Sequence, residues 1–302
     1  MHRLYSTGIL PTIHGTKKNR QNGDFFVSFH FVIQSGRKIN WEVELMESFN
    51  STSFRLDGRV ALVTGGAKGL GKYYSIALAM YGAKIFVVSR SRDGWDELRS
   101  KVSELGSEVN FLQEDISQTD CADQIVEAVI KQYGHLDILV NNAGIQIRND
   151  VLAFKDEDWD KVINLNLNAL YHLSHAAAKV MVKQSSGKII NIGSMQSYRA
   201  GKYIFPYTAS KHGVLGLTKA YADALAPYHI QVNGLAPGYI KTDMTKALQD
   251  DPVRGPEIQA HIPSGDWGVP ENLMGPMIFL ASSASDYVTG VMLPVDGGYL
   301  LR

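Results

Sequence analysis

The sequence predicts an α/β protein whose single domain contains a doubly wound parallel sheet of about seven strands, with helices on both faces. The first supporting observation is that short apolar runs rich in Val and Ile alternate with amphipathic helical patterns along most of the chain. The second is that these runs are apolar throughout, as in strands with both faces buried. The third is that glycine or polar residues follow several of the runs, where ligands bind in such sheets.

The predicted elements follow one another in order from residue 60 to residue 298. Strands are expected at residues 60–64, 84–89, 109–113, 136–140, 189–192, 230–238 and 291–298. Helices are expected from the first glycine-rich turn to residue 83, at residues 95–105, 121–133 and 158–183, and around residues 207–211. Residues 252–270 contain several prolines and glycines, which predicts a mobile lid.

Composition and charge exclude several classes of function. The 302 residues include 30 basic and 30 acidic side chains, so no net field attracts nucleic acid or an anionic membrane. The single cysteine, Cys121, cannot form an internal disulfide, which favours a reducing, cytoplasmic location. The sequence has neither Cys and His at metal-ligand spacing nor the ~18 apolar residues in a row that span a membrane. We therefore expect no metal, no nucleic acid and no membrane partner.

The first 45 residues differ from the rest, and we predict an N-terminal extension at residues 1–45 and the folded domain at residues 46–302. Up to Asn40 the extension carries six Lys or Arg and one acid, Asp24, which suits an organelle presequence. It lacks a clean amphipathic period and a signal cleavage pattern. The favoured interpretation is therefore a disordered or mis-assigned start, with Met46 beginning the working protein.

A glycine-rich turn follows the first predicted strand and precedes a helical pattern. Its candidate binding residues are Gly65, Lys68, Gly69, Leu70 and Gly71. A strand, a turn and a helix N-terminus present unpaired N–H groups and a positive dipole end to a pyrophosphate, and glycine allows the backbone to approach it. The turn alone could be a structural loop, but its flanking strand and helix favour a dinucleotide site.

The end of the second predicted strand bears on the choice of dinucleotide. An acid at this point accepts the ribose hydroxyls of NAD, whereas a base accommodates the 2′-phosphate of NADP. This chain has Ser89 and Arg90 there and Lys68 in the glycine turn, which favours NADP over NAD. NAD stays open, because Asp93 could turn inward.

Three polar residues near the fifth predicted strand suit redox chemistry at carbon and oxygen. Ser194 follows that strand, and Tyr207 and Lys211 are four residues apart on a predicted helix, which puts them on one face. An ammonium beside a phenol favours the phenolate and lowers its pKa from ~10 towards that of a general base. The Ser194 hydroxyl can hold the reacting oxygen. The Tyr and Lys pattern alone could equally be a buried aromatic with a solvated lysine.

Together, five motifs over residues 54–302 resemble the short-chain dehydrogenase/reductase superfamily. They are the glycine turn at residues 64–71, the Asn-Asn-Ala-Gly motif at residues 141–144, Ser194, the Tyr207 and Lys211 pair, and Pro237 with Gly238. The resemblance implies a Rossmann-type fold. Within the superfamily the chain is similar to the 2-deoxy-D-gluconate 3-dehydrogenase and gluconate 5-dehydrogenase group, through residues 141–148, 236–248 and 267–275.

This resemblance implies further roles. Tyr207 would be the acid and base, Lys211 would hold the nicotinamide ribose, and Asn166 would anchor a water that relays protons to the lysine. The other implied cofactor contacts are Asp115, Ile116, Asn142, Ala143, Gly144, Pro237, Gly238, Ile240 and Thr242. Asp115 could instead cap a helix. The superfamily also implies a homotetramer, with residues 299–302 suited to an interface.

Arginine is the natural partner of a sugar-acid carboxylate, because its guanidinium offers two parallel donors. Arg148 follows the fourth predicted strand, and Arg199 and Lys202 follow Ser194. Gln196 is a candidate for reading a substrate hydroxyl. Each of these could instead be a surface or subunit-contact residue.

The expected activity is that of an NAD(P)-dependent oxidoreductase that interconverts a secondary alcohol and a ketone on a small sugar acid. One alternative is another carbonyl reductase on the same scaffold, such as a 3-oxoacyl-carrier reductase, although the neutral charge offers no basic patch for the carrier. A second alternative is a dinucleotide-sensing protein without catalysis. Such a protein would be free to lose Tyr207 or Lys211, and both are present.

Overall fold

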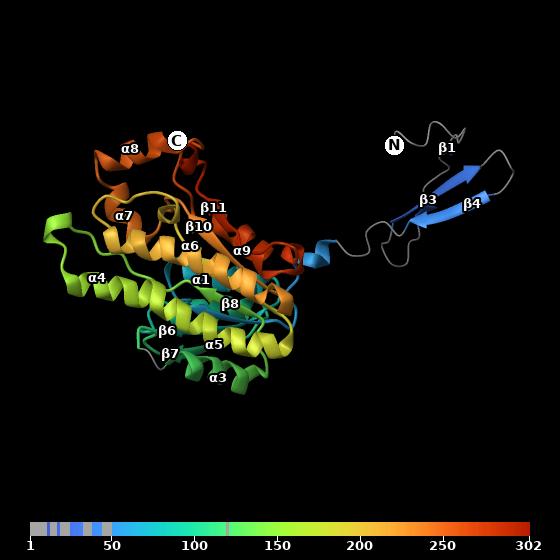
Figure 1. The fold of residues 1–302 in the computed structure, drawn as a ribbon, viewed down its shortest axis with the longest axis horizontal. Coiled ribbons are helices and arrows are strands. Elements are labelled where there is room, and N and C mark those ends of the chain that lie inside the picture. Colours follow the sequence, from blue (N-terminus) through green and yellow to red (C-terminus); the bar gives the residue numbers. More distant parts are fainter. Residues whose placement is uncertain (1–10, 13–16, 19–24, 33–37, 44–49, 119–120) are drawn as a thin grey trace. The chain divides into compact units, whose positions relative to one another are not determined.

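The computed structural model describes residues 11–12, 17–18, 25–32, 38–43, 50–118 and 121–302 of the chain (Figure 1). The chain divides into two compact units, Met1–Ser53 and Phe54–Arg302. In the first unit an antiparallel sheet forms around β3, which pairs with β1, β2 and β4. These strands are β1 (Pro11–Thr12), β2 (Lys17–Lys18), β3 (Phe25–Val32) and β4 (Lys38–Val43). The remainder of the predicted extension over residues 1–45 lies outside the described residues.

The second unit contains a seven-stranded sheet in the order β11-β10-β9-β8-β5-β6-β7, with every pair parallel. The strands are β5 (Val60–Thr64), β6 (Lys84–Ser89), β7 (Val109–Gln113), β8 (Ile138–Asn141), β9 (Gly187–Ile192), β10 (Ile230–Pro237) and β11 (Met292–Val295). The predicted doubly wound α/β fold is confirmed. Three strand starts differ from the prediction: β8 begins two residues later, β9 two residues earlier and β11 one residue later. For β8 the reason is that the Gln184 amide holds both the N–H and the carbonyl of Leu136 and keeps it out of the ladder.

Helices cover both faces of this sheet, because successive strand residues point to opposite sides. Ala61 and Val63 pack in the apolar cluster that includes α1, α2 and α9, whereas Val60 and Leu62 pack in the cluster that includes α3 and α5. The helices are α1 (Gly69–Met80), α2 (Trp95–Glu104), α3 (Cys121–Tyr133), α4 (Asp156–Ile163), α5 (Ala169–Gln184), α6 (Phe205–Leu225), α7 (Asp243–Gln249), α8 (Arg254–His261) and α9 (Met274–Ala281). Helix α1 stops short of the predicted residue 83, since Gly82 takes a left-handed backbone with φ of 102°.

The strand order places a topological switch between β5 and β8. From β5 the chain winds outward to β6 and β7, and it then returns to the other side of β5 with β8. Ligands of such sheets bind in the crevice at the carboxyl ends of the two strands that flank this switch. The glycine turn after β5 and the motif at residues 141–144 after β8 therefore meet there.

Two helical segments shape the region above this edge. Helices α4 and α5 are joined by a π-helical turn at Asn164–Asn168, so the predicted long helix is continuous. The predicted lid at residues 252–270 contains helix α8, whose Ile258 is buried in an apolar cluster with Met195 and Trp267. Within the described part of the chain, no helix combines the length and apolarity needed to cross a membrane.

Candidate active site

A cavity of about 460 Å³ lies at the switch between β5 and β8. Twelve of the predicted cofactor-binding residues line it: Gly65, Lys68, Gly69, Leu70, Ser89, Arg90, Asp115, Ile116, Asn142, Ala143, Gly144 and Thr242. The sequence reasoning missed other lining residues, namely Val88, Ser91, Glu114, Ile145, Leu165, Asp243 and Met244. All of these except Met244 are direct chain neighbours of predicted residues, so including the residues on either side of each predicted one would have found them.

The glycine turn packs closely against the end of β8 at Gly65 and Gly71. A Cβ on Gly71 would lie 2.1 Å from the carbonyl oxygen of Gly65, so only glycine fits there. Gly65 has a φ of 62° and lies against Asn142. The Asn142 amide donates to the carbonyls of Thr64 (2.9 Å) and Gly65 (3.3 Å). This cradle of exposed backbone is what a dinucleotide pyrophosphate requires, and the residues present fit that group.

Charged residues gather at the end of the cavity beside β6. Lys68 forms an ion pair with Asp93 at 3.4 Å, and both side chains are exposed. Asp93 also accepts from the Ser91 hydroxyl. Asp93 thus turns toward the Lys68 ammonium, and Arg90 lies on the cavity wall beside them.

Asp115 forms a local turn rather than a helix cap. Its carboxylate accepts from the N–H of Ser117 (3.0 Å) and from the Ser117 hydroxyl (2.8 Å). Helix α3 begins six residues later, at Cys121. The alternative of an Asp115 N-cap therefore does not hold, and its side chain lines the cavity.

Six predicted cofactor residues do not line this cavity: Gly71, Tyr207, Lys211, Pro237, Gly238 and Ile240. Pro237 ends β10, and a Cβ on Gly238 would lie 2.6 Å from the Cα of Asp296. Ile240 is buried in the core beside α1. These last three residues are held by packing within the protein.

Ser194 and Tyr207 meet at the carboxyl end of β9. Ser194 begins a short 3-10 turn, and its hydroxyl accepts from the N–H of Gln196 at 3.1 Å. Contrary to the sequence-based expectation, the pKa of Tyr207 lies above its ordinary value, because burial raises it more than the hydrogen bond with Ser194 lowers it. The two hydroxyl groups nevertheless face one another, as catalysis at a shared oxygen requires.

Lys211 lies one helical turn after Tyr207 on α6. Its Nζ is 5.5 Å from the centre of the Tyr207 ring and donates to the carbonyl of Ile192 at 2.6 Å. Burial lowers the pKa of Lys211 to about 8. Because its Nζ donates to the end of β9 and its charged form is disfavoured, the lysine does not offset the effect of burial on the phenol.

Asn166 uses its whole side chain to hold the loop after β8. The amide is buried in the π-helical turn, accepts from the Ile145 N–H (2.8 Å) and donates to the Ile145 carbonyl (2.9 Å). It also donates to the Ser210 hydroxyl at 3.2 Å. Ile145 and Leu165 line the cavity, so Asn166 joins the cavity wall to α6, the helix of Tyr207 and Lys211.

The predicted substrate residues point in different directions. The Gln196 amide is oriented to donate to the carbonyls of Arg199 (3.2 Å) and Ala200 (2.9 Å), which commits its nitrogen to the protein. Arg199 lies over the Tyr299 ring at 4.8 Å, and Lys202 lies over the Tyr203 ring at 4.9 Å. Arg148 also lies against Tyr203, at 5.7 Å. Arg199 and Arg148 thus stack on different rings, and Tyr239 is the residue that both arginines face.

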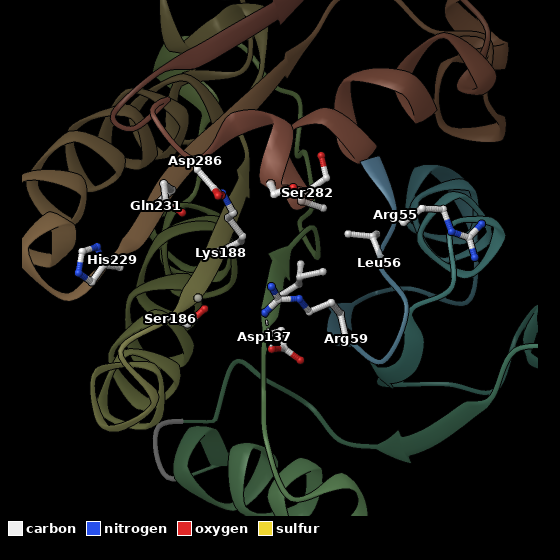
Figure 2. A pocket seen from close by; sticks show the side chains of 14 residues that line it. Arg55, Leu56, Arg59, Asp137, Ser186, Lys188, His229, Gln231, Ser282 and Asp286 are labelled. Atoms are coloured by element: carbon white, nitrogen blue, oxygen red, sulfur yellow. Dashed lines mark hydrogen bonds and ion pairs between the residues drawn. The ribbon is translucent and has the colours of Figure 1, made fainter. Parts of the chain in front are cut away.

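A second cavity, of about 260 Å³, lies at the amino ends of β8, β9 and β10 (Figure 2). Its charged groups are already neutralised, since Arg59 pairs with Asp137 at 3.0 Å and Lys188 pairs with Asp286 at 2.7 Å. Every predicted site residue lies at or near the opposite edge of the sheet. This cavity is therefore not a candidate for the reaction. Among the described residues, no group of three or more His, Cys, Asp or Glu could hold a metal ion.

The fold and the site define a Rossmann-type oxidoreductase acting on CH–OH groups. A sequence model of the short chain dehydrogenase family matches residues 59–253. The chain belongs to this family.

Relatives and solved structures resemble this chain over most of their length. It is 44% identical over 252 residues to the 2-dehydro-3-deoxy-D-gluconate 5-dehydrogenase of Escherichia coli, covering 83% of this chain and 99% of the relative. It is 40% identical over 248 residues to the 5-keto-D-gluconate 5-reductase of the same organism, covering 82% and 98%. The crystal structure of a gluconate 5-dehydrogenase from Burkholderia cenocepacia, in complex with NADP and tartrate, has a TM-score of 0.80 and 39% identity, covering 83% and 98%.

Proposed function

We propose that this chain is an NAD(P)-dependent oxidoreductase that interconverts a secondary alcohol and a ketone on a sugar acid of the gluconate or deoxygluconate type. The observation that carries the proposal is the meeting of the Ser194 and Tyr207 hydroxyl groups at the end of β9, beside Lys211. The names of two relatives specify carbon 5 of a keto or deoxy sugar acid. Carbon 5 is therefore the first position to test.

Each of the site residues has a separate role in this proposed reaction. The Ser194 hydroxyl holds the substrate oxygen, while the Tyr207 phenol donates a proton to it during ketone reduction and accepts one during alcohol oxidation. Burial keeps Tyr207 protonated near neutral pH, which suits the reductive direction. Lys211 holds the end of β9 in place through the Ile192 carbonyl. Asn166 fixes the adjacent cavity wall, and the proton-relay water at Asn166 stays part of this proposal.

A nicotinamide dinucleotide would supply or accept the hydride when bound. The residues that would hold it line the cavity at the switch, with the pyrophosphate on the glycine turn and the adenosine end beside Asp115 and Arg90. Lys68 and Arg90 favour a 2′-phosphate and hence NADP. Solved relatives were crystallised with NADP, which agrees with this preference.

A substrate screen tests the proposal. Purified protein is assayed at the nicotinamide absorbance band with NADPH and NADH against a panel of keto sugar acids, and with NADP and NAD against the corresponding sugar acids. We expect the highest kcat/KM with a 5-keto sugar acid and NADPH. Turnover of 3-oxoacyl thioesters alone would support the carrier reductase instead, and dinucleotide binding without any turnover would support a sensing protein.

We also propose that the protein is a homotetramer, which would appear as a single species of four subunits in sedimentation.

A further inference from the structure

Three loops converge beside Ser194 because of the order of the strands. Strand β9, which delivers Ser194, lies between β8 and β10 in the sheet. Arg148 lies in the loop after β8, and Tyr239 lies just after β10. The carboxyl ends of parallel strands meet at one edge. Arg148 and Tyr239 therefore lie on the loops that leave the two strands on either side of β9.

Helix α8 brings a second arginine to this edge. Met195, directly after Ser194, is buried in the same apolar cluster as Ile258 of α8, with Tyr239 packed against it. Arg254 is the first residue of α8, one helical turn before Ile258, and it is half-buried. The sequence pattern did not single out Arg254, because it begins a short helix inside a segment expected to be a lid.

The Arg148 and Arg254 guanidinium groups are close enough to repel one another. The pKa of Arg148 lies below its ordinary value because of partial burial and because Arg254 is nearby. Tyr239 faces Arg148, Arg199 and Arg254. Among the described residues, no carboxylate lies within ion-pair distance of either arginine. The nearby Asp251 carboxylate accepts from the N–H groups of Val253 and Arg254. Arg254 also attracts this carboxylate, but Asp251 is one negative charge beside two guanidinium groups, so the positive charge is in excess. An excess of positive charge fits an anionic ligand.

Tyr203 holds Arg148 in this position. Its ring lies under the Arg148 guanidinium, and its carbonyl accepts from the Asn149 N–H at 3.0 Å. Tyr203 has a φ of 70°, the left-handed region that is unfavourable for a bulky residue. Such strain is retained where the surrounding structure fixes it, commonly at functional sites. The loop thus keeps a fixed cation beside the reacting groups.

We propose that Arg148 and Arg254, together with the Tyr239 hydroxyl, bind the carboxylate of the substrate while its secondary alcohol meets Ser194 and Tyr207. Two guanidinium groups can each donate two parallel hydrogen bonds to a carboxylate, which fixes the orientation of the carbon chain as well as its charge. This inference rests on the proposed sugar-acid activity and deepens it, since it assigns the group that distinguishes an acid from a neutral sugar. Arg199 lies over the Tyr299 ring, which packs against Tyr239, and adds a third positive charge facing Tyr239.

The test compares an acid with a neutral substrate in matched variants. Arg254→Ala, Arg254→Lys and Arg148→Ala are assayed with a keto sugar acid and with a neutral ketose of equal chain length. We expect kcat/KM for the acid to fall roughly 10- to 100-fold in both alanine variants, less in Arg254→Lys, and to change less than twofold for the ketose. Arg99→Ala removes an exposed arginine of α2 and should leave both values unchanged.

A binding measurement separates this inference from the proposed activity. Tartrate, a non-reacting hydroxy diacid, is titrated calorimetrically into each NADP-loaded protein. We expect Arg254→Ala and Arg148→Ala to weaken tartrate binding at least tenfold, with NADP affinity within twofold of the parent. Unchanged tartrate affinity, absent binding to the parent protein, or equal losses for acid and ketose would each overturn the carboxylate site. Absence of turnover with every sugar acid, with tartrate binding still dependent on both arginines, would refute the proposed activity alone.

Discussion

Lys211 Nζ lies 5.5 Å from the centre of the Tyr207 ring and donates to the Ile192 carbonyl at 2.6 Å. The ammonium therefore bridges the catalytic helix and the last residue of β9. This bridge requires a lysine buried to 5% exposure, and burial lowers the pKa of that lysine to about 8. The position of Lys211 thus has a cost in stability near neutral pH, and this cost has a measurable dependence on pH.

We expect the unfolding free energy of the wild type to rise, relative to Lys211→Met, as the pH increases from about 8 to 9.5. In this window the unfolded chain keeps the Lys211 proton, with a pKa of about 10.4, while the folded protein has released it. Stability rises with pH wherever the unfolded state binds more protons, here by up to about 2 kcal/mol. Urea unfolding at pH 7, 8, 9 and 9.5 measures this. Parallel curves for the two proteins would show that Lys211 has an ordinary pKa.

Activity of the Lys211→Met variant should fall at least ~100-fold.

Tyr74→Phe should stabilise the protein by about 1 kcal/mol. Tyr74 on α1 is fully buried, and its hydroxyl has no hydrogen-bond partner within the described part of the chain. A buried polar group without a partner loses its hydration and gains nothing in return. Thermal unfolding of the cofactor-free protein gives the change. The matched control is Tyr133→Phe, which should be destabilising because the Tyr133 hydroxyl accepts from Asn110 at 2.8 Å. A loss of stability in both variants would contradict the prediction.

Arg90→Ala should raise the KM for NADP roughly tenfold or more while changing that for NAD less than twofold. Arg90 lines the cavity beside Lys68, where a 2′-phosphate would lie. Arg92→Ala is the control, since Arg92 stacks over Phe111 at 5.1 Å and does not line the cavity. Initial rates measured with NADP and with NAD give the two KM values for each variant. Equal increases in the two KM values would mean that Arg90 does not distinguish the cofactors.

Removal of residues 1–45 should leave kcat, KM and the thermal midpoint unchanged. The unit Phe54–Arg302 contains the whole seven-stranded sheet and every predicted site residue. A longer truncation, of residues 1–58, should destabilise the protein by about 2 kcal/mol or more, because Leu56 is buried in the core and its N–H donates to the Tyr81 carbonyl. Insolubility or loss of activity in the shorter truncation would refute the prediction that residues 1–45 are dispensable.

The sequence predicted much of the fold because its signals are local. Strands β5, β6, β7 and helix α3 begin and end where the apolar runs indicated. Cavity-lining residues were found wherever a glycine or polar residue followed a strand. The order of the strands was not predicted, since pairing depends on contacts far apart in the chain.

Two features of the site could not be predicted from local sequence patterns. The direction of the Tyr207 pKa depends on how deeply α6 is buried, which spacing does not reveal. Arg254 became a candidate only when Ile258 was seen to pack against Met195, because that contact brings a helix of the supposed lid over the catalytic turn. Residues that act through tertiary contact need a structure to be recognised.

Asn166 forms its two hydrogen bonds to Ile145 with the main-chain N–H and carbonyl of that residue, not with its side chain. The anchor is therefore independent of the side chain at position 145, which can vary while the main-chain hydrogen bonds are kept. Substitutions in a loop held by its main chain therefore offer a route to new substrate specificity while the groups that perform hydride transfer stay unchanged.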